Sequence, residues 1–126
     1  MSKKICWMSQ HEMHPVQKKV LRRMFGEDVE VTHDQRSFDS AEIIVRRYRE
    51  GGYDDIIVVA PLSVIHRMTE LGVRPLWAQS EVVKDSERAD WSFKGRHYRF
   101  LKFQRVERLE LVLGDLGPAA QRQSDD

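Results

Sequence analysis

The sequence predicts an α/β protein, a Rossmann-like three-layer sandwich with a mostly parallel sheet. The first observation is the stretch of residues 55–63, where a run of apolar, mostly β-branched side chains lies between charged residues and a proline. Such a run is typical of a strand buried on both faces. The second observation is that short apolar strands alternate with segments of helical periodicity. This alternation predicts the order β-α-β-α-β-α-β, with helical crossovers between parallel strands.

The elements before the central strand follow from local patterns. Residues 4–8 form a short apolar run, which predicts the first strand. Pro15 suits the first position of a helix, and Gly26 is the residue expected to end it. Residues 29–33 alternate apolar with polar side chains and are rich in β-branched types, which predicts the second strand.

Two further helices are expected on either side of the central strand in sequence. Apolar residues recur at helical spacing after Asp39, whose distance from Glu42 is that of a capping box, and Gly51 closes this second helix. The third helix follows the central strand and runs to Gly72, with Ser63 as its expected N-cap.

The C-terminal part changes pattern and is expected to be antiparallel. Residues 75–83 predict a fourth strand. Residues 94–96 (Lys-Gly-Arg) separate two aromatic runs, which indicates a hairpin. Residues 101–113 alternate apolar with charged side chains and predict a long antiparallel strand, with a bulge near Gln104, where the alternation slips by one residue.

Composition narrows the possible functions. The 126 residues carry 21 basic and 20 acidic side chains, so the near-neutral net charge of +1 predicts no extended field for nucleic acid, and binding through local Arg and Lys rows is the less favoured option. The single cysteine, Cys6, excludes an internal disulfide and suits the cytoplasm. No signal peptide or membrane span is expected. Residues 1–113 are expected to form one domain, followed by a disordered tail at residues 114–126.

A ligand is expected at the carboxyl ends of the strands, where neighbouring crossovers leave to opposite faces. With strand order 2-1-3-4 this point lies between the first loop, residues 9–14, and the loop at residues 60–63; with order 3-2-1-4 the first loop would instead face residues 79–81. The helix N-termini nearby favour an anion such as a phosphate. The candidate catalytic residues are Ser9 and His11, and the candidate ligand-binding residues are Gln10, His14, Gln17, Pro61, Leu62 and Ser63.

The residues of the first loop do not fit the common phosphate-binding and zinc-binding motifs. The first loop has no glycine, so it lacks both common phosphate-binding glycine motifs. His11 and His14 are three residues apart before a proline, whereas a zincin helix needs a separation of four. Neither a metal nor a cofactor is therefore expected. The aromatic hairpin at residues 91–103 is interpreted as core or a dimer surface, with a stacking platform for bases as the other option.

Residues 9–17 (Ser-Gln-His-Glu-Met-His-Pro-Val-Gln), with a second loop after a buried strand, resemble small Rossmann-like CRISPR-associated proteins of the CARF and ring-nuclease type. The resemblance covers roughly residues 1–80, and His14 stands where related loops have threonine. It implies a homodimer that binds cyclic oligoadenylate and cleaves it without metal, through attack of a ribose 2′-hydroxyl on the adjacent phosphate. Ser9, His11 and the N-terminus of the helix at Ser63 would then contact the phosphate, and Gln10 and Gln17 the ribose or base.

Two hypotheses of function follow. The first is a small cytoplasmic protein, expected to be a homodimer, that binds a nucleotide-like or phosphate ligand in the crevice and cleaves a phosphodiester there. The alternative is a non-catalytic interaction protein, of phage or accessory type, that uses the C-terminal hairpin against a protein partner. The first hypothesis predicts that Ser9, His11 and Ser63 converge in one concave pocket, and the second predicts a filled or flat crevice and an exposed apolar hairpin.

Overall fold

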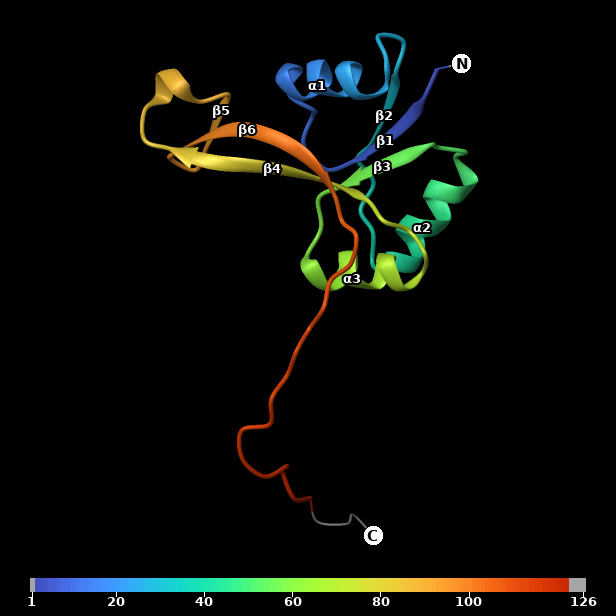
Figure 1. The fold of residues 1–126 in the computed structure, drawn as a ribbon, viewed down its shortest axis with the longest axis vertical. Helices are drawn as coiled ribbons and strands as arrows, with labels where there is room; N and C mark the ends of the chain where they lie inside the picture. Colours follow the sequence, from blue (N-terminus) through green and yellow to red (C-terminus); the bar gives the residue numbers. More distant parts are fainter. Residues whose placement is uncertain (1, 123–126) are drawn as a thin grey trace.

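The computed structural model describes residues 2–122 and shows an α/β protein built on one mixed sheet (Figure 1). Within these residues the fold has three α-helices, six strands and one short 3-10 helix. In chain order the elements are β1 (Lys4–Met8), α1 (Pro15–Phe25), β2 (Glu30–Asp34), α2 (Ala41–Glu50), β3 (Asp55–Val58), α3 (Leu62–Glu70), β4 (Leu76–Val83), η1 (Ser86–Arg88), β5 (Trp91–Phe93) and β6 (Arg96–Arg105).

The strands lie in the order β2-β1-β3-β4-β6-β5. The neighbouring pairs from β2 to β4 are parallel, while β6 runs antiparallel to both β4 and β5. The mostly parallel sheet and the antiparallel C-terminal strands are therefore confirmed, and of the two strand orders that the sequence left open, 2-1-3-4 is the one observed. The sheet curls like half a barrel, with β4 and β6 reaching beyond the helices, so its shape departs from a regular Rossmann-like sandwich (Figure 1).

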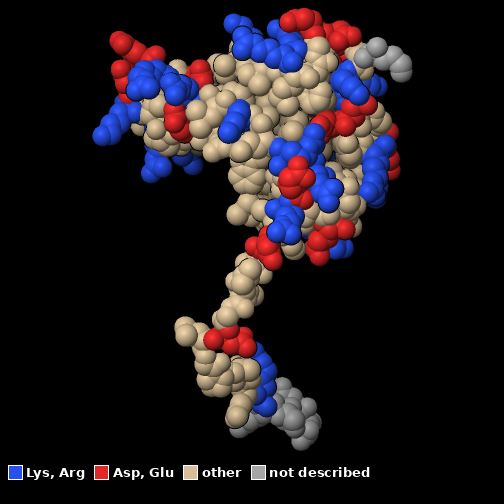
Figure 2. Space-filling view, viewed as in Figure 1, with Lys and Arg blue, Asp and Glu red and all other residues tan. Residues whose placement is uncertain are grey.

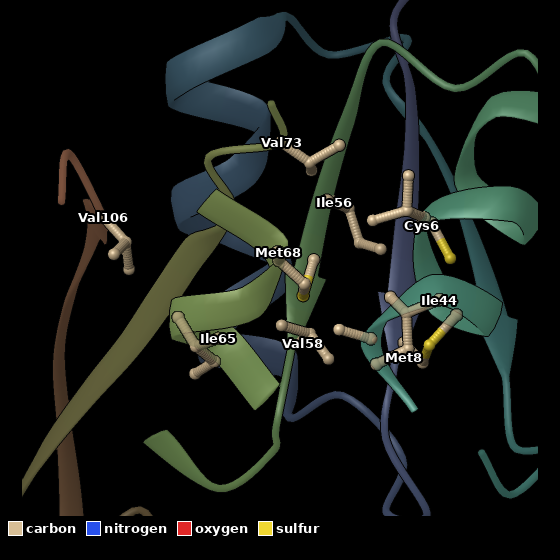
Figure 3. Packing of buried hydrophobic residues seen from close by; sticks show 11 residues of the cluster. Cys6, Met8, Ile44, Ile56, Val58, Ile65, Met68, Val73 and Val106 are labelled. Carbon is tan, nitrogen blue, oxygen red and sulfur yellow. The ribbon is translucent and has the colours of Figure 1, made fainter. Parts of the chain in front are cut away.

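Helix α1 covers one face of the sheet, and α2 and α3 cover the other (Figure 1). The pleat of β1 divides its side chains between these layers, because neighbouring residues of a strand point to opposite faces. Ile5 and Trp7 pack on the α1 side, whereas Cys6 and Met8 pack on the side of α2 and α3. Figure 3 shows the second cluster, in which side chains from the two helices meet those of β1 and β3. Ile56, Ile57 and Val58 of β3 are buried, as the apolar run predicted, but the strand ends at Val58 and Val59 is 54% exposed.

Two predicted helix caps are wrong. The N-cap of α2 is Ser40, whose Oγ accepts a hydrogen bond from the Ile43 N–H at 3.4 Å, so Asp39 lies one residue too early to cap it. Helix α3 begins at Leu62 with Pro61 at its N-cap, and no side chain caps it. Ser63 is thus inside the first turn, because the N-cap, Pro61, lies two residues earlier than the serine pattern suggested, with an extended backbone.

The predicted long last strand is also wrong beyond Arg105. The N–H of Val106 donates to the Pro75 carbonyl at 2.9 Å, and β4 begins only at the next residue, Leu76, so the chain past this point has no strand to pair with. The bulge lies at Leu101 rather than near Gln104, because consecutive residues of β4 pair with residues on either side of Leu101.

The C-terminal segment forms no helix or strand between residues 106 and 122. Val106 still packs into the core, but Leu111, Val112, Leu113 and Leu116 are largely exposed, and the segment runs away from the body (Figure 1). The predicted tail begins at residue 114, and its last residues, 123–126, lie outside the described part. Within residues 2–122 no helix is long and apolar enough to span a membrane.

Candidate functional site

A cleft of about 630 Å³ opens at the carboxyl end of β1, on the side of the sheet that carries α1. The crossovers after β1 and β3 leave toward opposite faces, so this edge is the switch point at which open parallel sheets bind ligands. Three segments form the cleft: the loop after β1 with the start of α1, the middle of β4, and the β5–β6 hairpin. It lies within the volume range of small-molecule sites.

The loop after β1 is held by its own hydrogen bonds. The indole N–H of Trp7 donates to the carbonyl of His11 at 2.7 Å, and the backbone N–H of His11 donates to Ser9 Oγ at 3.1 Å. The carbonyl of Ser9 lies 2.7 Å from Nε2 of His33, at the end of β2. Ser9 is buried as a result, and the loop folds into a fixed rim for the cleft.

Helix α1 is capped by its own residues at the point where it meets the cleft. His14 Nδ1 accepts a hydrogen bond from the Val16 N–H at 3.1 Å, and Gln17 Oε1 accepts one from the His14 N–H at 3.0 Å. Pro15 has no N–H, and the N–H groups of Gln17 and Lys18 both donate to the His14 carbonyl. The backbone donors that a phosphate would use at this helix end are therefore already engaged.

Aromatic side chains of the hairpin form the opposite wall. Trp91 and Tyr98 stack with ring centroids 6.3 Å apart and an interplanar angle of 18°. Each of the two loop histidines contacts this wall: the rings of His14 and Trp91 are 5.6 Å apart, and those of His11 and Phe93 are 5.8 Å apart in an edge-on arrangement. The cleft is thus lined by π faces from segments about eighty residues apart in sequence.

The electrostatic character of the cleft is set by one carboxylate. Glu12 is the only carboxylate among the lining residues, which include the imidazoles of His11 and His14 but no Lys or Arg. Lys94, at the hairpin turn, lies outside the lining, and its Nζ is 5.3 Å from the centre of the Phe93 ring. Figure 2 shows basic and acidic side chains interspersed over this side of the molecule, without one continuous basic surface.

Four of the eight predicted site residues meet in the cleft: Ser9, His11, His14 and Gln17. The other four do not line it. Gln10 is exposed outside the lining, and Pro61, Leu62 and Ser63 are exposed at the start of α3. The reason is that α3 packs on the opposite face from α1, so only Val59 of the loop after β3 reaches the cleft. The expected convergence of Ser9, His11 and Ser63 is therefore wrong.

The predicted catalytic pair is close in sequence but is not arranged as a nucleophile and its base. Ser9 Oγ contacts the backbone N–H of His11, while the His11 ring packs against Phe93. Among residues 2–122, no group of three or more His, Cys, Asp or Glu side chains is placed to hold a metal ion. The geometry supports binding through aromatic faces and hydrogen bonds better than it supports a proton-transfer pair.

Sequence reasoning missed the residues that close the cleft. The sequence favours core or dimer contact for Trp91, Phe93 and Tyr98, and Glu12, although it belongs to the polar first loop, is not among the candidate site residues. The available signal was the density of aromatic residues on both strands of a short hairpin, which favoured a stacking platform as the second option. Strand order alone did not indicate that this hairpin lies beside the loop after β1. The strands β4 and β6 extend beyond the helices, and the hairpin lies next to that loop because the sheet is curled.

Comparison with protein-family models, with curated proteins and with solved structures finds no match for this chain. The resemblance of residues 9–17 to CARF-type ring nucleases therefore stays a prediction, and the function is argued from the cleft.

Proposed function

We propose that the protein binds a small nucleotide-like ligand and that the cleft between the β1–α1 loop and the β5–β6 hairpin holds its planar heteroaromatic part. The observation that carries this proposal is the stacked pair of Trp91 and Tyr98 in the lining of the cleft, next to His14. Aromatic faces in the lining favour a flat ligand, and base-on-aromatic stacking contributes about 1–3 kcal/mol per base.

Polar groups of the loop favour a ligand that also forms hydrogen bonds. Gln17 is buried, and its amide oxygen is engaged by the backbone of His14, so its amide N–H groups are the donors that it can offer. Glu12 offers a carboxylate, and Ser80 a hydroxyl from β4. An apolar cleft with a few convergent polar groups is the usual form of a small-molecule site.

Binding is tested by titrating the full-length protein with nucleosides, nucleotides and cyclic oligonucleotides while recording thermal stability. A ligand at a hundred times its Kd adds about 2.7 kcal/mol to the free energy of unfolding. Trp91→Ala is expected to weaken binding by about 5- to 100-fold. Trp77→Ala is the matched control, because Trp77 is partly exposed on β4 and does not line the cleft. Equal loss in both variants, or no ligand response at all, would contradict the proposal.

The narrower form of the proposal is a cytoplasmic Rossmann-like protein that binds cyclic oligoadenylate and cleaves it without metal. It draws support from the switch-point position of the cleft and from the first-loop resemblance. Its test is incubation with cyclic oligoadenylates in excess EDTA, followed by chromatography of the products. Linear products that disappear in Ser9→Ala would support it, and intact cyclic ligand after prolonged incubation would exclude it.

The alternative proposal is protein interaction, including self-association. It is favoured by apolar side chains left in solvent on the C-terminal elements. Phe93 at the hairpin is 50% exposed, and Leu111, Val112 and Leu113 are 76%, 82% and 78% exposed. Sedimentation equilibrium gives the molecular mass. A dimer that dissociates in Leu111→Ser/Leu113→Ser but persists in a control such as Glu50→Gln would support this alternative, and a monomer at all concentrations would remove the homodimer.

A further inference from the structure

We infer that the cleft selects an unphosphorylated ligand, a free nucleobase or a nucleoside, over the corresponding phosphate ester. This inference rests on the proposed binding function and narrows its ligand class. It runs against the phosphate expected from sequence, and three features of the cleft carry it: its charge, the state of the α1 N-terminus and the hydrogen-bonding groups that remain available.

The charge of the cleft disfavours an anion. A phosphate site is usually built from Arg or Lys side chains, and none lines this cleft. Glu12 instead places a carboxylate at the rim, and no described residue forms an ion pair with it. Lys94 lies over the Phe93 ring at the hairpin turn and outside the lining. A phosphate dianion held in the cleft would therefore meet the carboxylate of Glu12, with no Lys or Arg in the lining to pair with.

The N-terminus of α1, which was the expected phosphate cradle, has no donors to spare. Pro15 contributes none, Val16 donates to the His14 imidazole, and Gln17 donates to the His14 carbonyl. A phosphate there would have to displace the histidine cap, and the helix would lose that hydrogen bond. The capped N-terminus of α1 therefore offers a bound anion few free backbone N–H groups for hydrogen bonds.

The groups that remain match the edge of a base. Glu12 accepts hydrogen bonds, and the amide N–H groups of Gln17 donate them. A nucleobase presents ring or exocyclic N–H donors beside ring nitrogen or carbonyl acceptors on one flat edge, and its faces suit the Trp91 wall. A phosphate oxygen offers only acceptors, so it leaves Glu12 without a partner.

The test uses matched ligand pairs, adenosine with AMP and guanosine with GMP, titrated into the full-length protein by calorimetry at two salt concentrations. We expect one nucleoside to bind at least about tenfold more tightly than its monophosphate, with the gap shrinking as salt screens the repulsion. In Glu12→Gln the difference in affinity between the nucleoside and its monophosphate should become smaller. Glu50→Gln, a change of the same kind on α2 and away from the cleft, should leave it unchanged.

Each outcome separates this inference from the binding proposal. A nucleotide or cyclic oligoadenylate that binds as tightly as the nucleoside, or more tightly, would overturn the inference while leaving the cleft as the binding site. A preference for the nucleoside that Glu12→Gln does not reduce would also overturn it, because the charge argument would then be wrong. Absence of binding by either member of both pairs would remove the proposed function itself.

Discussion

His14 and Gln17 cap helix α1 for each other: the imidazole of His14 accepts from the helix backbone, and the amide oxygen of Gln17 accepts from the backbone N–H of His14. This is a capping box in which histidine takes the place of serine or threonine. Because Nδ1 accepts the bond, the neutral ring carries its proton on Nε2. Two residues expected to bind ligand therefore have a structural task first, and they present to the cleft only what the cap leaves free.

The cap gives a first prediction for stability. His14→Ala should lower the free energy of unfolding by about 1 kcal/mol, because the Val16 N–H loses its acceptor. His14→Asn should recover most of this loss, since asparagine is among the best N-cap residues. Urea denaturation of the three proteins measures the difference. If His14→Ala and His14→Asn are equally destabilised, contact with Trp91 rather than capping is the main contribution of this side chain.

The fold was largely predictable from sequence because its parallel half obeys local rules. The apolar run in β3 predicted a strand covered on both faces. Pro15 and Gly26 predicted the two ends of α1 to within one residue. These signals depend on neighbouring residues only. The end of β6 was not predictable in this way, because it is set by Pro75, a residue about thirty positions away at which the partner strand has not yet begun.

The candidate site was predictable only in part, for the same reason. Ser9 and His11 were found because a switch-point rule places the loop after the first strand at a crevice. Ser63 was wrongly joined to them, since the rule names both loops at the edge but not the face on which a cleft forms. The hairpin wall at Trp91 depends on the curl of the sheet, which no local pattern of residues reports.

The ion pair between Asp55 and Arg105 gives a second prediction. Two nitrogens of the Arg105 guanidinium lie 2.7 and 2.6 Å from the two carboxylate oxygens of Asp55, and this joins the end of β6 to the start of β3. Asp55 is buried, and the carboxylate raises the pKa of Arg105 above its usual range. Arg105→Ala should cost about 2 kcal/mol, less than a fully buried pair because the Arg105 side chain is 38% exposed.

The measurement is again urea denaturation, with two matched controls. Arg105→Lys should recover only part of the loss, because an ammonium cannot form both bonds of the guanidinium fork. Arg108→Ala, at a side chain that is mostly exposed, should change stability by no more than about 0.5 kcal/mol. A loss in Arg105→Ala no greater than that in Arg108→Ala would show that the pair contributes no net stability.

Asp34 gives a prediction about acid stability. Hydrogen bonds from the Arg36 side chain are the main cause that holds the pKa of Asp34 below its usual range, and burial partly opposes them. A carboxyl whose pKa is lower in the folded state than in the unfolded chain stabilises the fold at higher pH. That contribution is complete above the unfolded pKa, near 3.9, and is lost as the pH falls through the lower folded value.

Asp34→Asn should therefore lower the melting temperature at pH 7, and the deficit relative to the parent protein should shrink as the pH falls from about 5 to about 2.5. Asp39→Asn is the control, because Asp39 is exposed and, within the described residues, neither caps α2 nor forms an ion pair. Thermal melts across this pH range give the melting temperatures of the two variants and of the parent protein. A constant deficit between Asp34→Asn and the parent would mean that packing, and not the charge, explains the loss.

Cys6 gives a last prediction, on reactivity. Burial on the α2 and α3 side of β1 is the main cause that raises the pKa of this thiol from 9.0 to about 11, and the carboxylate of Asp34 adds to it. The thiolate is the reactive form, so at pH 8 the folded protein should react with a thiol reagent at least roughly 100-fold more slowly than the chain in 6 M guanidinium.

Because the pKa of Cys6 is raised in the folded state, the free energy of unfolding should also fall as the pH rises from about 9 toward 11. Cys6→Ala should lose this alkaline dependence, and it should be less stable than the parent at every pH because the substitution leaves a small cavity. Rapid labelling of the native parent at pH 8 would contradict the reactivity prediction and would show that β1 opens readily.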